Sequence, residues 1–303
     1  MELKTTLGSI ELEHPIMNAA GPRCKTIEEV RILARTPVAA IVVGSITKEP
    51  RPGNQGDVYH SGPNFSLNSL GLPNGGWTYY YEHLPEMVDI ARQAGKILIV
   101  SIAGFSPEEY DELANKASQR GLLILRECNL GCPNVWSDGK QKRIASFDPL
   151  LVERILQAGW YDLVKVSPFS DPTHLAEIAS VISKSTALAV TVANTFPNAF
   201  ALQEDGRSAI SPQFSDGLAG MAGPALKAIN MGQVLQWKKL LPKHIAVIGA
   251  GGIRTGQDVK DYLKAGASAV QIATAYADEG AGVFDRILME YVALIEAETP
   301  VAP

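Results

Sequence analysis

The chain has 303 residues, of which 46% are hydrophobic and 19% charged, which is typical of a folded protein with a large core rather than a disordered one. Its net charge of -5, with no lysine- or arginine-rich block, argues against a nucleic-acid-binding surface. No apolar run approaches the roughly 20 residues of a membrane span. The three cysteines are typical of reduced thiols, so we expect a cytoplasmic protein that does not enter a membrane.

Short apolar segments rich in β-branched residues recur along the chain, and each leads into a helical pattern. Eight such segments begin at Pro15, Ala39, Ile97, Leu122, Asp162, Ala187, His244 and Ala269. Helical patterns lie between them, for example TIEEVRILAR (26–35), SPEEYDELANKASQR (106–120), THLAEIASVISK (173–184) and TGQDVKDYLKAG (255–266). Alternation of this kind indicates a parallel sheet covered on both faces. The pattern predicts an α/β fold, a (β/α)8 TIM barrel.

A doubly wound open sheet is the alternative fold. Such sheets usually have fewer strands and often carry their glycine fingerprint at the first turn, whereas the glycine-rich turn here follows the seventh strand. No repeat, low-complexity tract or linker divides the chain, so we expect a single domain over residues 1–303.

Three segments are longer than ordinary barrel loops. The alternating pattern of LKTTLGSIELEHP, around Gly8, predicts an N-terminal β-hairpin that closes the barrel floor. The segments 47–80 and 195–225 are long and rich in glycine and proline. Because loops at the carboxyl ends of barrel strands usually build the site, we expect these long βα loops to lie over the mouth.

Residues just past the strand ends should converge on the barrel mouth. They are Asn18, Ala20, Gly21, Gly44, Ser45, Asn129, Cys132, Lys165, Asn194, Thr195, Gly251, Gly252, Ala273 and Thr274. This set is rich in amides and poor in carboxylates.

The sequence GAGGIRTG (249–256), followed by QIATA (271–275), suits the phosphate site often found after strands seven and eight of a barrel. Two ordinary glycine turns are the simpler interpretation of the same letters. Lys165 lies inside the apolar strand DLVKV, where it either points inward and holds a charge or points outward and reaches solvent.

Asn68, Asn129, Asn134 and Asn194 each offer a donor and an acceptor, which suits a planar ring with amide or imide edges. A single asparagine in such a place is more often a turn residue. The scattered histidines and the isolated CNLGC segment give no metal-binding motif, and no serine nucleophile elbow is present.

Several motifs occur together in one order over essentially the whole chain: MNAAG (17–21), RPGNQ (51–55), LNSLGLPN (67–74), NLGCPN (129–134), VKVSP (164–168), ANT (193–195), GAGGIRTGQD (249–258) and QIATA (271–275). In these motifs the chain resembles the dihydroorotate dehydrogenases of class 1A. A cysteine within NLGCPN is the mark of the soluble class 1 enzymes. The membrane-bound class has a similar segment with serine in place of the cysteine.

The resemblance implies FMN in the barrel mouth and a substrate beside it. The implied cofactor contacts are Ala20, Gly21, Gly44, Ser45, Asn129, Lys165, Gly220, Gly251, Gly252, Ala273 and Thr274. The implied substrate contacts are Asn68, Leu70, Gly71, Leu72, Asn129, Asn134, Asn194 and Thr195.

The implied reaction is oxidation of dihydroorotate to orotate in pyrimidine biosynthesis. Cys132 would be the base that takes the C5 proton as hydride leaves C6 for flavin N5, and an ordinary thiol pKa of ~8.5 suits that role. Lys165 would stabilise negative charge at N1/C2–O of the reduced flavin. We expect fumarate as electron acceptor and a homodimer.

Gly44 departs from the family pattern, because class 1A enzymes usually carry lysine there. We expect a weakened substrate site that Gly44→Lys would improve. Arg35 and Lys48 are the nearest candidate replacement cations, but the favoured interpretation is that Arg35 ends a helix and Lys48 is solvated. The departure leaves other functions open: an FMN-dependent oxidoreductase of another dihydropyrimidine or cyclic amide, a non-redox phosphate-binding barrel lyase, or a protein that binds flavin without turnover.

Overall fold

Parallel strands form the central sheet of the computed structural model, which describes residues 3–119, 121–137, 140–142 and 144–298. Within these residues eight strands pair in the order β3-β18-β17-β13-β12-β9-β8-β4. Their bounds are β3 (Ile16–Asn18), β4 (Ala40–Ile46), β8 (Ile97–Ile102), β9 (Ile124–Asn129), β12 (Leu163–Lys165), β13 (Ala189–Val192), β17 (Ala246–Ala250) and β18 (Ala269–Ile272). Each strand overlaps one of the predicted segments, and β4 extends one residue beyond its segment, so the predicted (β/α)8 barrel is confirmed. The single domain over residues 1–303 stays a prediction.

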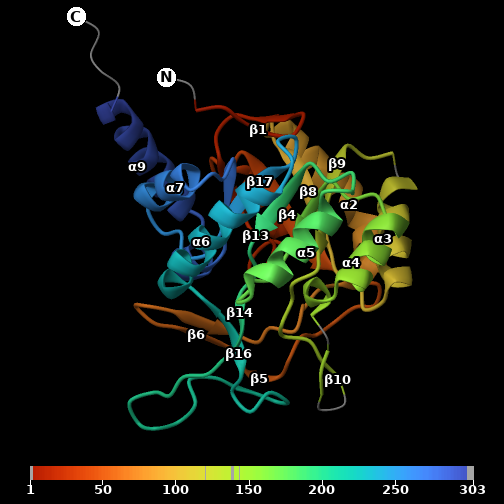
Figure 1. Cartoon of the computed structure of the whole chain (residues 1–303), viewed down its shortest axis with the longest axis vertical. Coiled ribbons are helices and arrows are strands. Elements are labelled where there is room, and N and C mark those ends of the chain that lie inside the picture. The colour runs from red at the N-terminus through yellow and green to blue at the C-terminus, as the bar shows by residue number, and fades with distance from the viewer. Residues whose placement is uncertain (1–2, 120, 138–139, 143, 299–303) are drawn as a thin grey trace, which may run out of the picture.

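Helices surround this sheet (Figure 1). They are α1 (Ile27–Ala34), α2 (Gly76–Gln93), α3 (Pro107–Gln119), α4 (Pro149–Ala158), α5 (Pro172–Ile182), α6 (Pro224–Leu240), α7 (Gly256–Lys264), α8 (Thr274–Glu279) and α9 (Val283–Glu298), with a 3-10 turn at Ala145–Phe147. Local signals fix where several begin: Thr26 and Thr255 form capping boxes with Glu29 and Asp258. Among the described helices, none has both the length and the apolar character needed to cross a membrane.

The barrel closes between β3 and β4 through a side chain. Asn18 Nδ2 donates to Val42 O at 2.7 Å, and Val42 N donates back to Asn18 Oδ1 at 2.9 Å. One backbone bond supports them, from Ala39 N to Ile16 O at 2.9 Å. Asn18 is completely buried. We predicted Asn18 at the mouth, and this was wrong, because the amide replaces the missing backbone pairing of two strands.

The N-terminal hairpin closes the floor of the barrel, as predicted. Strands β1 (Thr5–Leu7) and β2 (Ile10–Leu12) pair antiparallel around Gly8. Leu7 and Leu12 are buried in the same apolar cluster as Met17 and Leu163, which point into the barrel. Figure 1 shows β1 at the upper end of the barrel in this view.

The two long loops join at the opposite end of the barrel (Figure 1). Their strands are β5 (Gly56–Asp57), β6 (Tyr59–Ser61), β7 (Ser66–Asn68), β14 (Phe196–Ala199), β15 (Ser211–Pro212) and β16 (Ala219–Ala222), and a further hairpin contains β10 (Trp136–Ser137) and β11 (Lys140–Gln141). Four of them form an antiparallel sheet in the order β14-β16-β7-β6, here called the mouth sheet. The sequence predicted loops over the mouth but not that they pair with each other.

Gly44 lies where the pairing of β4 with β8 shifts register, between Val43 and Ile46. Its φ of +109° is a backbone conformation that L side chains rarely adopt. A Cβ atom at Gly44 would lie 2.7 Å from Ser101 O and 2.8 Å from Ile46 N, both backbone atoms. The backbone therefore has no room for the lysine that we expected to improve the site.

We predict that Gly44→Lys destabilises the protein. The left-handed conformation and the backbone clash should lower the free energy of unfolding by about 2 kcal/mol or more, measured by chemical denaturation. Gly232→Lys on α6 is the control, because a Cβ there has nothing within 4 Å. A Gly44→Lys protein as stable as the wild type would contradict the prediction.

Candidate active site

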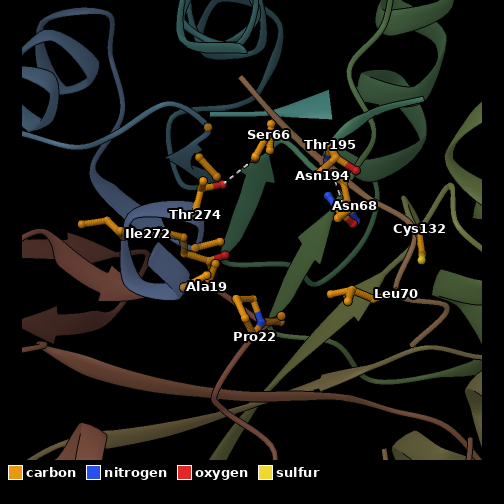
Figure 2. A pocket seen from close by; sticks show the side chains of 18 of the residues that line it. Ala19, Pro22, Ser66, Asn68, Leu70, Cys132, Asn194, Thr195, Ile272 and Thr274 are labelled. Carbon is orange, nitrogen blue, oxygen red and sulfur yellow. Dashed lines mark hydrogen bonds between the residues drawn. The ribbon is translucent and has the colours of Figure 1, made fainter. Parts of the chain in front are cut away.

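A cavity of ≈ 300 Å³ opens at the carboxyl ends of the barrel strands, beneath the mouth sheet. Its wall contains every cofactor and substrate residue predicted from the sequence except Gly220. In Figure 2, Ile272 and Thr274 lie on one side, while Asn68, Asn194 and Thr195 lie on the side nearer Cys132. The convergence predicted for the residues at the strand ends is confirmed for all of that set except Asn18.

The asparagines of the cavity form a connected network. Asn129 Nδ2 donates to Ser45 Oγ at 2.8 Å, and Asn194 Nδ2 donates to Asn129 Oδ1 at 3.1 Å. Asn134 Nδ2 donates to Asn68 Oδ1 at 2.8 Å. Because each amide has a partner that fixes its orientation, the remaining donors and acceptors face the cavity in defined directions.

Gly220 lies behind this network rather than in the cavity wall. Its N–H donates to Asn134 Oδ1 at 3.1 Å, and its carbonyl accepts from Asn68 Nδ2 at 3.2 Å. A Cβ at Gly220 would lie 2.1 Å from Thr195 Oγ1. The structure therefore corrects the predicted position of this residue: Gly220 holds the amides of Asn68 and Asn134 rather than lining the cavity, because β16 pairs with β7 in the mouth sheet.

The glycine turn after β17 presents its backbone to the cavity. Gly251 and Gly252 have φ of +112° and +72°, and both line the cavity. Thr274, across the turn, shares a hydrogen bond with Ser66 of the mouth sheet at 3.4 Å (Figure 2). A close approach of backbone N–H groups suits an anion such as a phosphate.

Lys165 points into the barrel, which excludes the outward alternative. It is 4% exposed and lines the cavity. Its Nζ donates to Gln271 Oε1 at 3.5 Å. The cation is thus held at the bottom of the cavity, where it can balance negative charge on a bound ring.

Cys132 is half-buried in the cavity wall. Burial raises the pKa of its thiol, and the Asn134 backbone together with the charges of Arg51 and Lys165 offsets part of that rise. The ordinary thiol pKa expected from the sequence is therefore corrected upward, because removal from water disfavours the thiolate. The free protein holds this thiol protonated at neutral pH.

Arg51 is a neighbour that the sequence analysis did not single out. Its Nε donates to Gly71 O at 3.0 Å, and its guanidinium lies 5.0 Å from the centre of the Phe105 ring. Its charge acts on the thiol of Cys132. The motif RPGNQ contains this arginine, but only the fold places it near the cysteine.

Neither candidate replacement cation for a lysine at Gly44 lines the cavity. Arg35 caps the end of α1, and Lys48 pairs with Glu112 at 2.8 Å on the surface. Lys25, which the sequence analysis did not name, lines the cavity instead. Backbone bonds hold its loop beside Gly44, since Gly44 N donates to Cys24 O at 3.0 Å.

The Lys25 ammonium has no hydrogen-bond or ion-pair partner among the described residues. The other cavity cations are engaged: Lys165 contacts Gln271, and Arg254 lies 3.1 Å from Glu279. Lys25 can therefore meet an anionic ligand without breaking an ion pair.

The cavity as a whole fits a planar, phosphorylated cofactor with a second small ligand beside it. The glycine turn offers a cradle for the phosphate, and Lys165 balances charge on a ring. Thr195 Oγ1 is buried without a hydrogen-bond partner among the described residues, although Thr195 lines the cavity, so it remains available to a ligand. In the described part of the chain, no group of three or more His, Cys, Asp or Glu residues is arranged to hold a metal ion.

Comparison with known proteins agrees with this geometry. The family model described as "Dihydroorotate dehydrogenase" matches residues 2–295. The chain is 33% identical over 295 residues to "Dihydroorotate dehydrogenase A (fumarate)" of Lactococcus lactis subsp. lactis, covering 95% of this chain and 92% of that protein. It is 31% identical over 297 residues to "Probable dihydroorotate dehydrogenase A (fumarate)" of Streptococcus pneumoniae, covering 96% of this chain and 93% of that protein. The chain therefore belongs to the dihydroorotate dehydrogenase family, in its class 1A branch.

Proposed function

We propose that this protein oxidises dihydroorotate to orotate in pyrimidine biosynthesis, with FMN as cofactor and fumarate as electron acceptor. One observation carries the proposal: a single cavity is lined by a thiol, a network of hydrogen-bonded amides and a glycine turn. The names of the relatives support the same reaction. A lyase would leave the thiol and the amide network without a role, so we do not favour it.

The two ligands would bind on different sides of the cavity. Gly251, Gly252 and Thr274 would hold the phosphate of FMN, and Ser45 and Lys165 would contact its ring. The bound FMN would supply the hydride acceptor. In Figure 2, Thr274 lies on the other side of the cavity from Asn68 and Asn194, so the phosphate and the substrate would not compete for the same donors.

Substrate would bind on the amide side, near Cys132. Asn68, Asn134 and Asn194 present donors and acceptors to the ring edges of dihydroorotate, as does the Leu70–Leu72 backbone. Cys132 would take the C5 proton in its thiolate form. The positive charges of Arg51 and Lys165 favour that thiolate and so help the base to form.

The electron acceptor and the assembly are further parts of the proposal. The chain has no dinucleotide fingerprint after its first strand, so NAD is not the acceptor that we propose. Fumarate resembles the substrate in being a small carboxylate, and the same cavity would serve both half-reactions. We propose a cytoplasmic homodimer.

Anaerobic mixing with dihydroorotate tests the function. We predict that the FMN-loaded wild type bleaches and that Cys132→Ala loses about 100-fold or more of the reduction rate while keeping FMN, since a positioned base contributes that much. Stopped-flow absorbance of the bound flavin measures the rate. A wild type that dihydroorotate does not bleach would refute the proposed substrate.

Cys128→Ala is the matched control for that variant. Cys128 is four residues away and fully buried in the core between the barrel and its helices, and it does not line the cavity. Removing its thiol should lower stability but leave the reduction rate within about twofold of the wild type. Equal losses in the two variants would assign Cys132 to packing.

We predict that flavin reduction by dihydroorotate accelerates with pH well into the alkaline range. The base acts as a thiolate, and burial raises the pKa of Cys132, so the active fraction still increases above the ordinary thiol value of ~8.5. Single-turnover reduction between about pH 6 and 10 measures this, with FMN retention checked at each pH. A rate that levels off below neutral pH would contradict the prediction.

We predict that Lys25→Gln weakens dihydroorotate binding by about tenfold, the lower end for a lost charge-assisted hydrogen bond. Lys25 is the cavity cation free to meet the substrate carboxylate, among the residues that the structure describes. Orotate carries the same carboxylate as dihydroorotate, so its dissociation constant should rise by the same factor, and titration of the oxidised holoprotein with orotate measures it. Lys48→Gln is the control, because Lys48 pairs with Glu112 outside the cavity. Unchanged orotate binding together with weakened FMN binding would contradict the prediction and indicate that Lys25 contacts the cofactor instead.

A further inference from the structure

A glutamate lies in the barrel interior beneath the cavity. Glu127 on β9 is completely buried, with its side chain on the inward face that it shares with Asn129. Its Oε2 accepts from Thr191 Oγ1 at 3.0 Å and from Gln271 Nε2 at 2.9 Å. Its Oε1 is buried without a hydrogen-bond partner among the described residues. Burial of a carboxylate is costly, so this acid calls for an explanation beyond packing.

Gln271 connects this acid to the cavity. The Gln271 amide donates through Nε2 to Glu127. The Oε1 of Gln271 therefore faces Lys165 Nζ, at 3.5 Å. Gln271 and Lys165 both line the cavity, whereas Glu127 does not. Because a carboxylate can only accept, Glu127 prevents the amide from flipping and presenting its N–H groups to the lysine.

Lys165 and Glu127 place charges of opposite sign at two depths in the barrel. Lys165 lies at the cavity, and Glu127 lies one step deeper on the neighbouring strand, since Leu163 of β12 pairs with Glu127 and Lys165 pairs with Asn129. Charges interact strongly in the interior of a barrel, where water does not screen them. Two-electron reduction adds negative charge to a flavin ring, so Lys165 favours that reduction and Glu127 opposes it.

We propose that Glu127 is a positioning residue that sets the reduction potential of the bound FMN, by balancing Lys165 and orienting Gln271. This inference rests on the proposed function, because it requires FMN in the cavity. Glu127 touches neither the cavity nor the reacting atoms, so its effect is on the ratio of reduced to oxidised cofactor bound rather than on proton transfer.

Glu127→Gln tests the role of the charge. Glutamine has nearly the same shape, and its Oε1 can accept from both Thr191 and Gln271, so the hydrogen bonds remain while the charge is lost. The affinity for reduced relative to oxidised FMN should rise about tenfold or more, which corresponds to a midpoint potential about 30 mV higher for a two-electron couple. Anaerobic equilibration of the holoprotein with an indicator dye measures the potential.

Thr191→Val is the matched control. It removes a hydrogen bond to the same carboxylate oxygen but keeps the charge and the contact with Gln271, so the potential should stay at the wild-type value. A Glu127→Gln potential equal to or below that of the wild type would overturn the proposal. Equal rises in both variants would also overturn it, since they would assign the effect to packing.

A second variant tests the same role if the Glu127→Gln protein does not fold. Glu127→Met combined with Thr191→Val removes the charge together with its hydroxyl partner, and it should show the same rise in potential. The dye titration uses no dihydroorotate, so it tests the role of Glu127 independently of the proposed substrate. A yellow protein with unchanged potential refutes only the role of Glu127, whereas a chain that takes up no FMN refutes the proposed function as well.

Discussion

The hydrogen bonds between the Asn18 amide and the Val42 backbone complete the ring of strands on which the site depends. Buried backbone groups must find partners, and the strand ladder supplies none between β3 and β4 at this point. With the ring closed, the carboxyl ends of all the barrel strands surround one cavity. The loops after β3 and β4 also meet there, since Gly21 N donates to Gly44 O at 3.1 Å.

The mouth sheet then fixes the amide side of this cavity. Pairing of Gly220 with Asn68 brings together two loops about 150 residues apart, and the Gly220 backbone orients Asn68 and Asn134. Bare glycine is needed here because any side chain would collide with Thr195. Because the amides are oriented before a ligand arrives, binding costs less ordering of side chains, and a ring with the wrong edges would leave buried polar groups unpaired.

The local sequence determined the strands, several helix starts and the glycine turn. Apolar runs and caps such as Thr26 with Glu29 act between residues a few positions apart, so their effects can be predicted without the fold. The convergence of Cys132, Lys165 and Asn194 followed from the barrel class alone, because strand ends of a closed parallel sheet must meet at one mouth. The family motifs then identified the branch.

The tertiary structure decided the properties that depend on where a side chain points, on its removal from water and on neighbours distant in the sequence. Asn18 stands at a strand end like Asn129, yet its side chain joins two strands while Asn129 faces the cavity. Only the packing of distant segments shows that burial raises the pKa of Cys132, that Gly44 has no room for a side chain, and that Lys25 rather than Lys48 lines the cavity. A sequence pattern gives the order and period of residues, whereas these properties arise from contacts between segments far apart in the chain.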